Sequence, residues 1–277
     1  MTGAPRAVFA DMDDTFLAYD KSIPQANLHM LDVLARLGIP FVPCTGRPVS
    51  AVPERVLMHE ATRFAVGSNG AVIHDARSQR VLHLEAMEKS AVLALYGLVK
   101  DLEVTFDVFA DGEVLAERCR YEAMGGYGID EPSLAVLRRV RKPVDLTVPQ
   151  IVARVRAIEK ITCFWHTPQD QQALREAIAA VPGFSVASGH VKNFELQAVG
   201  VSKGYALGWI CDHAGLSTKD VVAFGDAEND IPMLVAAGDG VAMANARPAV
   251  MAVANHVAGD NNQGGLAQYL SEAYGLR

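Results

Sequence analysis

Three carboxylates follow the first apolar run of the chain. Ala7-Val8-Phe9-Ala10 leads directly into Asp11-Met12-Asp13-Asp14-Thr15. Such a run predicts a buried parallel strand, and like charges crowded at its end repel one another and resist desolvation. A divalent cation would relieve that repulsion, because hard cations take carboxylate oxygens as ligands. The residues therefore indicate a metal site at the C-terminal edge of a parallel sheet, where open α/β folds bind ligands.

A second acidic group has the same relation to a later strand. Residues 220–225 form another apolar run, and Asp226-Ala227-Glu228-Asn229-Asp230 follows it. Either group alone could be a turn or a helix cap, since Asp favours both. Two groups, each placed directly after an apolar strand, predict instead that the carboxylates meet at one edge of the sheet.

Two further segments could bind an anion near these acids. Thr45-Gly46-Arg47 follows a predicted strand, and a hydroxyl with backbone N–H groups at a helix start suits a phosphate. Lys203 begins a predicted helix, where a cation opposes the helix dipole, so a purely structural role is slightly disfavoured. Taken alone, the first segment is also a common turn and the lysine could be a solvated surface residue.

The elements that must position these groups alternate strand and helix at both ends of the chain. Residues 85–190 differ, because Asp111-Gly112 between two apolar runs is typical of an antiparallel hairpin. We therefore predict an α/β fold with a Rossmann-like parallel core, residues 1–84 and 191–277, and an inserted α+β cap, residues 85–190. The predicted core strands are 6–11, 39–43, 63–67, 193–197 and 220–225, and the predicted core helices are 24–37, 48–60, 201–214 and 230–237.

Composition excludes several classes of partner. The formal net charge of -7 argues against a general affinity for nucleic acid phosphates or anionic membranes. No apolar run is long enough to span a bilayer, and the N-terminus lacks the apolar segment of a signal peptide. The four scattered cysteines are typical of free thiols in a reducing cytoplasm. We expect a cytoplasmic protein, and the sequence does not indicate its oligomeric state.

In this order the four segments resemble the haloacid dehalogenase superfamily of phosphohydrolases, whose motifs are D-x-D-x-T, T-G-R, a lysine and G-D-x-x-N-D. Length and spacing resemble the Cof-like branch, which carries a large α+β cap between the second and third motifs. Ser68-Asn69-Gly70-Ala71 and Gly200-Val201-Ser202-Lys203-Gly204 also look like that branch. Asp14 is a departure, since many members have Gly or Ser there; it adds a negative charge, and the sequence leaves its role open.

The resemblance implies a role for each acidic residue. Asp11 would be the nucleophile that forms an aspartyl-phosphate, and would bind Mg²⁺ together with Asp226. Asp13, placed on the same side of an extended segment as Asp11, would act as general acid and base, and its backbone carbonyl would bind the metal. Asp230 would hold a water of the metal shell or orient Lys203. Glu228 is expected at the surface.

The remaining residues would bind the phosphoryl group. Thr45 and Lys203 would stabilise its oxygens as charge develops. Gly46 and Arg47 would contact phosphate or substrate, and Asn229 would contact phosphate or the metal shell. The resemblance thus implies a Mg²⁺-dependent phosphatase acting on small phosphorylated metabolites, either sugar phosphates or phosphorylated cofactors.

Four other functions share parts of this pattern. A phosphomutase, or a specialised mannosylglycerate-type sugar-phosphate phosphatase, would use the same residues. A catalytically silent regulatory protein is disfavoured because every charged motif residue is present. A Ca²⁺-binding domain is disfavoured because the EF-hand spacing is absent.

Overall fold

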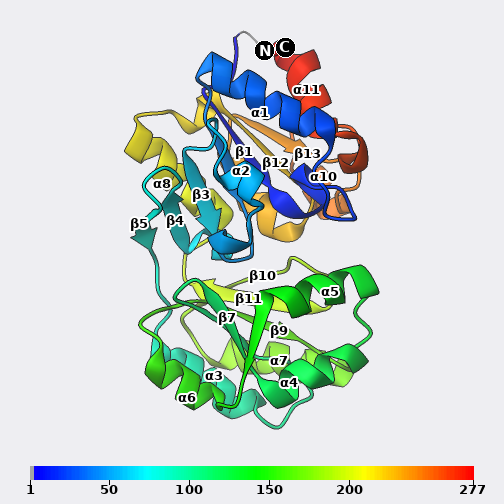
Figure 1. Ribbon diagram of the computed structural model, residues 1–277. Coiled ribbons are helices and arrows are strands. Elements are labelled where there is room, and N and C mark those ends of the chain that lie inside the picture. Colours follow the sequence, from blue (N-terminus) through cyan, green and yellow to red (C-terminus); the bar gives the residue numbers. More distant parts are fainter. Residues whose placement is uncertain (1–2) are drawn as a thin grey trace. The chain divides into compact units, whose positions relative to one another are not determined.

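The computed structural model describes residues 3–277, which form two compact units. Residues 3–83 and 202–277 make up the core, and residues 84–201 make up the cap. Each unit has its own sheet and its own hydrophobic interior (Figure 1). None of the described helices combines the length and apolar character needed to cross a membrane.

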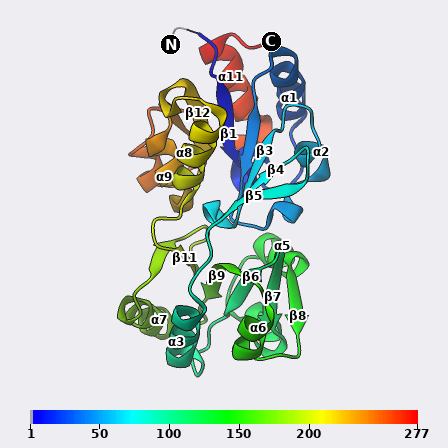
Figure 2. The same cartoon turned by 90° about the vertical axis from the view of Figure 1, so that its left-hand side faces the viewer.

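The core is a parallel sheet between two layers of helices (Figure 2). Among the described residues its strands run in the order β14-β13-β12-β1-β2-β3-β4-β5, parallel from β14 to β3, with β4 antiparallel to β3. The strands are β1 (Ala7–Asp11), β2 (Phe41–Cys44), β3 (Phe64–Gly67), β4 (Val72–Asp75), β5 (Arg80–Leu84), β12 (Val221–Gly225), β13 (Asp239–Ala242) and β14 (His256–Val257). The helices are α1 (Gln25–Leu37), α2 (Glu54–Leu57), α8 (Lys203–Ala214), α9 (Ile231–Ala236), α10 (Pro248–Met251) and α11 (Gly265–Tyr274).

Strand β1 lies at the centre of this sheet because it is apolar on both faces. Val8 and Ala10 pack with α1, α2 and α11, whereas Ala7 and Phe9 pack with α8, α9 and α10. Every residue of β1 is buried, and β1 pairs in parallel with β12 on one side and β2 on the other. A polar residue at the end of β1 therefore lies where the chain order of the strands reverses, the usual ligand position of such sheets.

The cap is a mostly antiparallel sheet with its larger hydrophobic core on one face, while α5 packs against Phe164 on the other. Its strand order is β10-β11-β9-β6-β7-β8, and only β7 and β8 form a parallel pair among the described pairings. Helices α3, α6 and α7 pack on the apolar face. The strands are β6 (Asp107–Ala110), β7 (Glu113–Glu117), β8 (Arg141–Val144), β9 (Ile158–Phe164), β10 (Phe184–Ala187) and β11 (Asn193–Ala198). The helices are α3 (Lys89–Val99), α4 (Arg118–Ala123), α5 (Glu131–Val140), α6 (Val148–Arg154) and α7 (Pro168–Ala180).

The mixed α/β class with a parallel core is confirmed, but the second boundary of the cap is not where the sequence placed it. The strand predicted over 193–197 was assigned to the parallel core, and that assignment is wrong. It is β11, which pairs antiparallel with β9 and β10 in the cap sheet. The cap therefore runs from residue 84 to residue 201, instead of 85–190. The predicted helix 48–60 is also wrong, because only a turn at Val49–Ala51 and α2 form there.

Candidate active site

Three of the predicted site residues lie at one edge of the core sheet, where neighbouring strands end. Asp11 is the last residue of β1 and pairs in register with Cys44, so Thr45 follows at the end of β2. On the other side, Ala10 pairs with Phe224 of β12, which ends at Gly225 just before Asp226. Parallel register thus places the first, second and fourth motifs at the same edge.

Lys203 connects two of these segments. Its Nζ donates to an oxygen of Asp11 and, at 2.6 Å, to Asp230 Oδ1, and the side chain is fully buried. Lys203 is the first residue of α8, whose N-terminus is capped by Ser202. A Cβ on Gly204 would lie 2.3 Å from the carbonyl oxygen of Pro232, so only glycine lets α8 approach α9 this closely. That approach brings the ammonium to the Asp230 carboxylate.

Asp230 fixes the loop that carries Asp226. Its Oδ2 accepts hydrogen bonds from the backbone N–H groups of Asp226 and Ala227, each at 3.0 Å. A Cβ on Gly225 would lie 2.4 Å from the Cβ of Asp230, so glycine is required there too. Asp230 therefore touches both Lys203 and the loop at the end of β12.

The acidic cluster at this edge has the oxygen ligands that a hard cation requires. One carboxylate oxygen from each of Asp11, Asp226 and Asp230 lies within 4.8 Å of the others. Burial, and then Asp230, raise the pKa of Asp226 to about 7. Burial also raises the pKa of Asp11, although Lys203 acts against it. One ammonium among three carboxylates leaves the cluster net negative, so the residues present fit a divalent cation with oxygen ligands.

Asp13 takes a different direction from the one the sequence predicted. The chain leaves β1 in an irregular, wound turn, Met12–Phe16, so the predicted extended segment is wrong. Asp13 is ion-paired with Arg47 through its Oδ1, and Lys21 Nζ lies 3.4 Å from the same oxygen. Arg47 therefore contacts a carboxylate of the first motif in this structure. Asp14 has a positive φ of 61° and accepts a hydrogen bond from Lys21 at 2.7 Å.

The second motif and Asn229 also lie in this part of the core. Thr45 is buried, and its Oγ1 accepts a hydrogen bond from the backbone N–H of Arg47 at 3.1 Å, which closes the Thr45-Gly46-Arg47 turn. The Asn229 amide donates to Asn69 Oδ1 at 3.1 Å. Glu228 is exposed and pairs with Arg247 at 3.1 Å, in agreement with its predicted surface position.

Sequence reasoning missed two polar residues of this region. Thr15 donates its hydroxyl to Asp226 Oδ1 at 2.7 Å and so links the first motif to the fourth. Asn69 holds Asn229, as described above. Both stand in segments that carry the family resemblance, D-x-D-x-T and Ser68-Asn69-Gly70-Ala71, so those motifs were the available signal.

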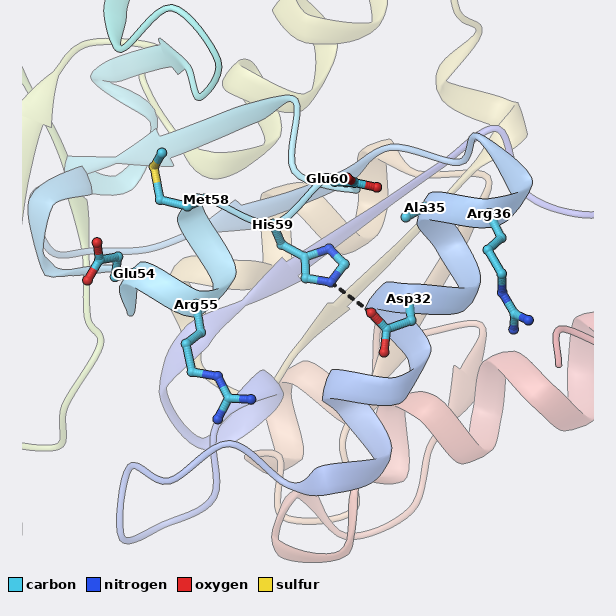
Figure 3. Close-up of a pocket in the computed structure, with 8 residues that line it drawn as sticks. All are labelled: Asp32, Ala35, Arg36, Glu54, Arg55, Met58, His59 and Glu60. Carbon is cyan, nitrogen blue, oxygen red and sulfur yellow. Dashed lines mark hydrogen bonds and ion pairs between the residues drawn. The ribbon is translucent and has the colours of Figure 1, made fainter.

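A surface pocket of the core lies away from these acids. Figure 3 shows it between α1 and α2, with His59 and Asp32 pointing toward one another at 3.2 Å. Its walls carry Arg55 and Glu54 from α2, and none of the predicted site residues lines it. Charges of both signs and the exposed His59–Asp32 hydrogen bond there give no reactive grouping.

Comparison with known proteins agrees with this geometry. The chain is 28% identical over 269 residues to a pyridoxal phosphate phosphatase, YbhA, of Escherichia coli, covering 96% of this chain and 97% of that protein. It is 27% identical over 282 residues to a 5-amino-6-(5-phospho-D-ribitylamino)uracil phosphatase, YitU, of Bacillus subtilis, with full coverage of both. A solved haloacid dehalogenase-like hydrolase from B. subtilis shares the fold, with a TM-score of 0.84 at 23% identity over 96% of this chain and 99% of that one. Because the family model of the haloacid dehalogenase-like hydrolases matches residues 8–270, this chain belongs to that family.

Proposed function

We propose that this protein is a Mg²⁺-dependent phosphatase that hydrolyses small phosphorylated metabolites through an aspartyl-phosphate. The observation that carries the proposal is the buried contact of Lys203 with Asp11 and Asp230, beside Asp226, at the end of β1. Burying a lysine costs desolvation free energy, so a lysine with no function would lie at the surface. A core that serves only stability would not gather three carboxylates around one ammonium.

In the first step, an Asp11 carboxylate oxygen attacks phosphorus, and the bond from phosphorus to the leaving-group oxygen breaks. Asp13 donates a proton to that oxygen, so the product leaves as an alcohol. Lys203 neutralises charge on the phosphoryl oxygens, and the Thr45 hydroxyl with the turn that follows it binds them. Carboxylates are weak nucleophiles, so this positioning supplies most of the rate.

In the second step, water attacks the phosphorus of the aspartyl-phosphate while Asp13 accepts its proton. The bond from phosphorus to Asp11 breaks, which releases inorganic phosphate and restores the carboxylate. Arg47, paired with Asp13 in this structure, must share that carboxylate with the substrate or exchange it for a phosphate oxygen. Mg²⁺ held by Asp11, Asp226 and the Asp13 carbonyl would supply charge neutralisation at the phosphoryl group.

We also propose that the polar face of the cap sheet selects the leaving group. Glu195, Thr162 and Asp107 stand side by side on β11, β9 and β6, on the face opposite α3, α6 and α7. Lys160 donates to Glu195 at 2.9 Å on the same face. Thr162 Oγ1 and Gln197 Oε1 are buried and have no hydrogen-bond partner in the described residues. Buried polar atoms of this kind favour a hydroxyl-rich ligand, such as a sugar or a polyol chain.

The alternatives are separable by one assay. A phosphomutase would return the phosphoryl group to an intermediate, and a mannosylglycerate-type phosphatase would accept a narrow set of sugar phosphates. The test is release of inorganic phosphate from a panel of sugar phosphates, polyol phosphates and pyridoxal phosphate, with Mg²⁺ or with chelator. Release that requires Mg²⁺ and no bisphosphate activator supports the proposal, whereas release in excess chelator, or none from any substrate, would contradict it.

A further inference from the structure

One segment of the core contacts the candidate site but contains none of the residues to which a role was assigned above. It is the loop Ser68–Gly70, which directly follows β3. All three of its residues have positive φ, 50°, 57° and 103° in order, and all three are buried. Left-handed backbone at a serine and an asparagine is uncommon, and it persists where the surroundings impose it, often at functional sites.

This loop holds the second motif from behind. The backbone N–H of Ser68 donates to the carbonyl of Arg47 at 2.9 Å, and that of Asn69 donates to the carbonyl of Thr45 at 3.1 Å. Both bonds depend on the left-handed path of the loop, which points successive N–H groups to one side. The carbonyls of the Thr45–Arg47 turn are thereby fixed by the loop.

The same loop packs against the start of α8. A Cβ on Gly70 would lie 2.1 Å from the carbonyl oxygen of Ser202 and 3.3 Å from the backbone nitrogen of Lys203. Only glycine fits this position, both because of its φ and because of that contact. The loop therefore touches the residue that presents the buried ammonium as well as the phosphate-binding turn.

Its third contact is made by a side chain. Asn69 Oδ1 accepts a hydrogen bond from Asn229 Nδ2 at 3.1 Å, across 160 residues of sequence. Asn69 is 1% exposed and Asn229 is 8% exposed. Asn229 Oδ1 is buried without a hydrogen-bond partner in the described residues. Asn69 thus fixes which end of the Asn229 amide is engaged and leaves the acceptor end for a donor that binds later.

We propose that Asn69 is a positioning residue of the active site, acting through Asn229 and resting on the phosphatase function proposed above. It holds the Asn229 amide so that Oδ1 accepts from a donor in the loaded site, either a water molecule or a hydroxyl of the substrate. This refines the expectation from sequence, in which Asn229 contacts phosphate or the metal shell. An acceptor oxygen is repelled by phosphate oxygens, so Asn229 contacts the groups around the phosphate instead.

The test removes the side chain without disturbing the backbone. Glycine adopts φ near 57° readily, so Asn69→Gly deletes the side-chain amide, including the acceptor for Asn229, and keeps the backbone path. Asn69→Asp restores an acceptor oxygen of the same shape, and aspartate tolerates the left-handed region. Gln79→Gly is the matched control, since Gln79 also has a positive φ of 56° but lies in the turn between β4 and β5.

We expect Asn69→Gly to lower kcat/KM for phosphate release by about 10- to 100-fold, mainly through kcat, with partial recovery in Asn69→Asp. The losses of activity in Asn69→Gly and Asn229→Ala should not be additive, because both substitutions remove the same contact. The unfolding midpoint of Asn69→Gly in chelator should match that of Gln79→Gly. Adding Mg²⁺ and beryllium fluoride, a mimic of the aspartyl-phosphate, should raise the midpoint of Asn69→Gly by less than it raises that of wild type.

The outcomes separate this inference from the proposed function. Wild type should show both phosphate release and the midpoint increase. If Asn69→Gly then shows the same activity and the same increase, the role of Asn69 is overturned and the proposed function stands. Fully additive losses with Asn229→Ala would overturn that role too. Absence of both effects in wild type would overturn the proposed function and this inference with it. A crystal structure of Asn69→Gly should show the Asn229 amide rotated and the loop backbone unchanged; an unmoved amide would count against the proposal.

Discussion

Replacing Lys203 by methionine tests the electrostatics of the candidate site. The side chain is fully buried, and its ammonium contacts Asp11 and Asp230. Its pKa is raised, because the two carboxylates outweigh the effect of burial, so the group is a cation at neutral pH. Methionine keeps the apolar stem and removes the charge, which leaves the acidic cluster without its cation.

The expected magnitude follows from that geometry. Removing one partner of a buried ion pair costs about 3–5 kcal/mol, and in a protein of this size about 2–4 °C of unfolding midpoint accompanies each kcal/mol. We expect the midpoint of Lys203→Met in chelator to fall by roughly 6–20 °C. Phosphate release at saturating Mg²⁺ should fall by about 10²–10³-fold, the usual cost of one preorganised donor. Because a dication neutralises the same carboxylates, Mg²⁺ should restore more of the midpoint in the variant than it adds to wild type.

Lys160→Met is the matched control for stability. Lys160 is 1% exposed and pairs with Glu195 at 2.9 Å within the cap unit, whereas the acidic cluster belongs to the core unit. It should lower the midpoint by a comparable amount without increasing the response to Mg²⁺. The assays are thermal unfolding with Mg²⁺ or chelator and phosphate release. Activity of Lys203→Met within about threefold of wild type, or equal Mg²⁺ responses in the two variants, would refute the reasoning.

Further predictions concern single residues. Asp226→Asn should abolish Mg²⁺-dependent turnover and yet stabilise the protein in chelator at pH 8 by up to about 4 kcal/mol, since the pKa of Asp226 lies about 3 units above that of a free aspartate and each unit corresponds to about 1.4 kcal/mol. The sign follows from the raised pKa of Asp226, about 7: ionisation of this carboxyl between about pH 4 and 7 reduces the stability of the metal-free protein. A lower unfolding midpoint in Asp226→Asn than in wild type would count against this. Glu228→Gln should leave turnover within about twofold, because an exposed ion pair contributes little. Gln197→Leu should change the ratio of kcat/KM between a sugar phosphate and pyridoxal phosphate by at least about fivefold, and an unchanged ratio would remove Gln197 from substrate selection. Asp14→Gly should change stability by less than about 1 kcal/mol, because relief of the positive φ offsets loss of the pair with Lys21; a larger loss in chemical unfolding would show that the pair is structural.

The convergence of the acidic segments at one edge of the core sheet was predictable because two simple rules act there. Apolar residues on both faces of β1 and β12 require a buried parallel sheet. Parallel strands then bring Asp11 and Asp226 to one edge, whatever the helices between them do. Lys203 could be assigned only through the family resemblance, because nothing local shows that a lysine at a helix start is fully buried.

The cap was harder to predict from sequence. Phe194 and Leu196 alternate with polar residues in β11, a pattern that fits an edge of the core as well as an antiparallel cap strand. Only pairing with β9 decides between them, and pairing is not encoded locally. Asn69 was missed for the same reason, because its partner Asn229 is 160 residues away and its left-handed φ depends on the packing of Gly70.

The account depends most directly on Asp11 as the nucleophile. The measurement is acid-quenched incubation of wild type and Asp11→Asn with a ³²P-labelled substrate and Mg²⁺, followed by detection of protein-bound label and mapping of the labelled peptide. We predict transient label on the peptide that contains Asp11 in wild type and none in Asp11→Asn, because an amide does not attack phosphorus at a useful rate. Label on another residue, or near-normal phosphate release by Asp11→Asn, would contradict the mechanism.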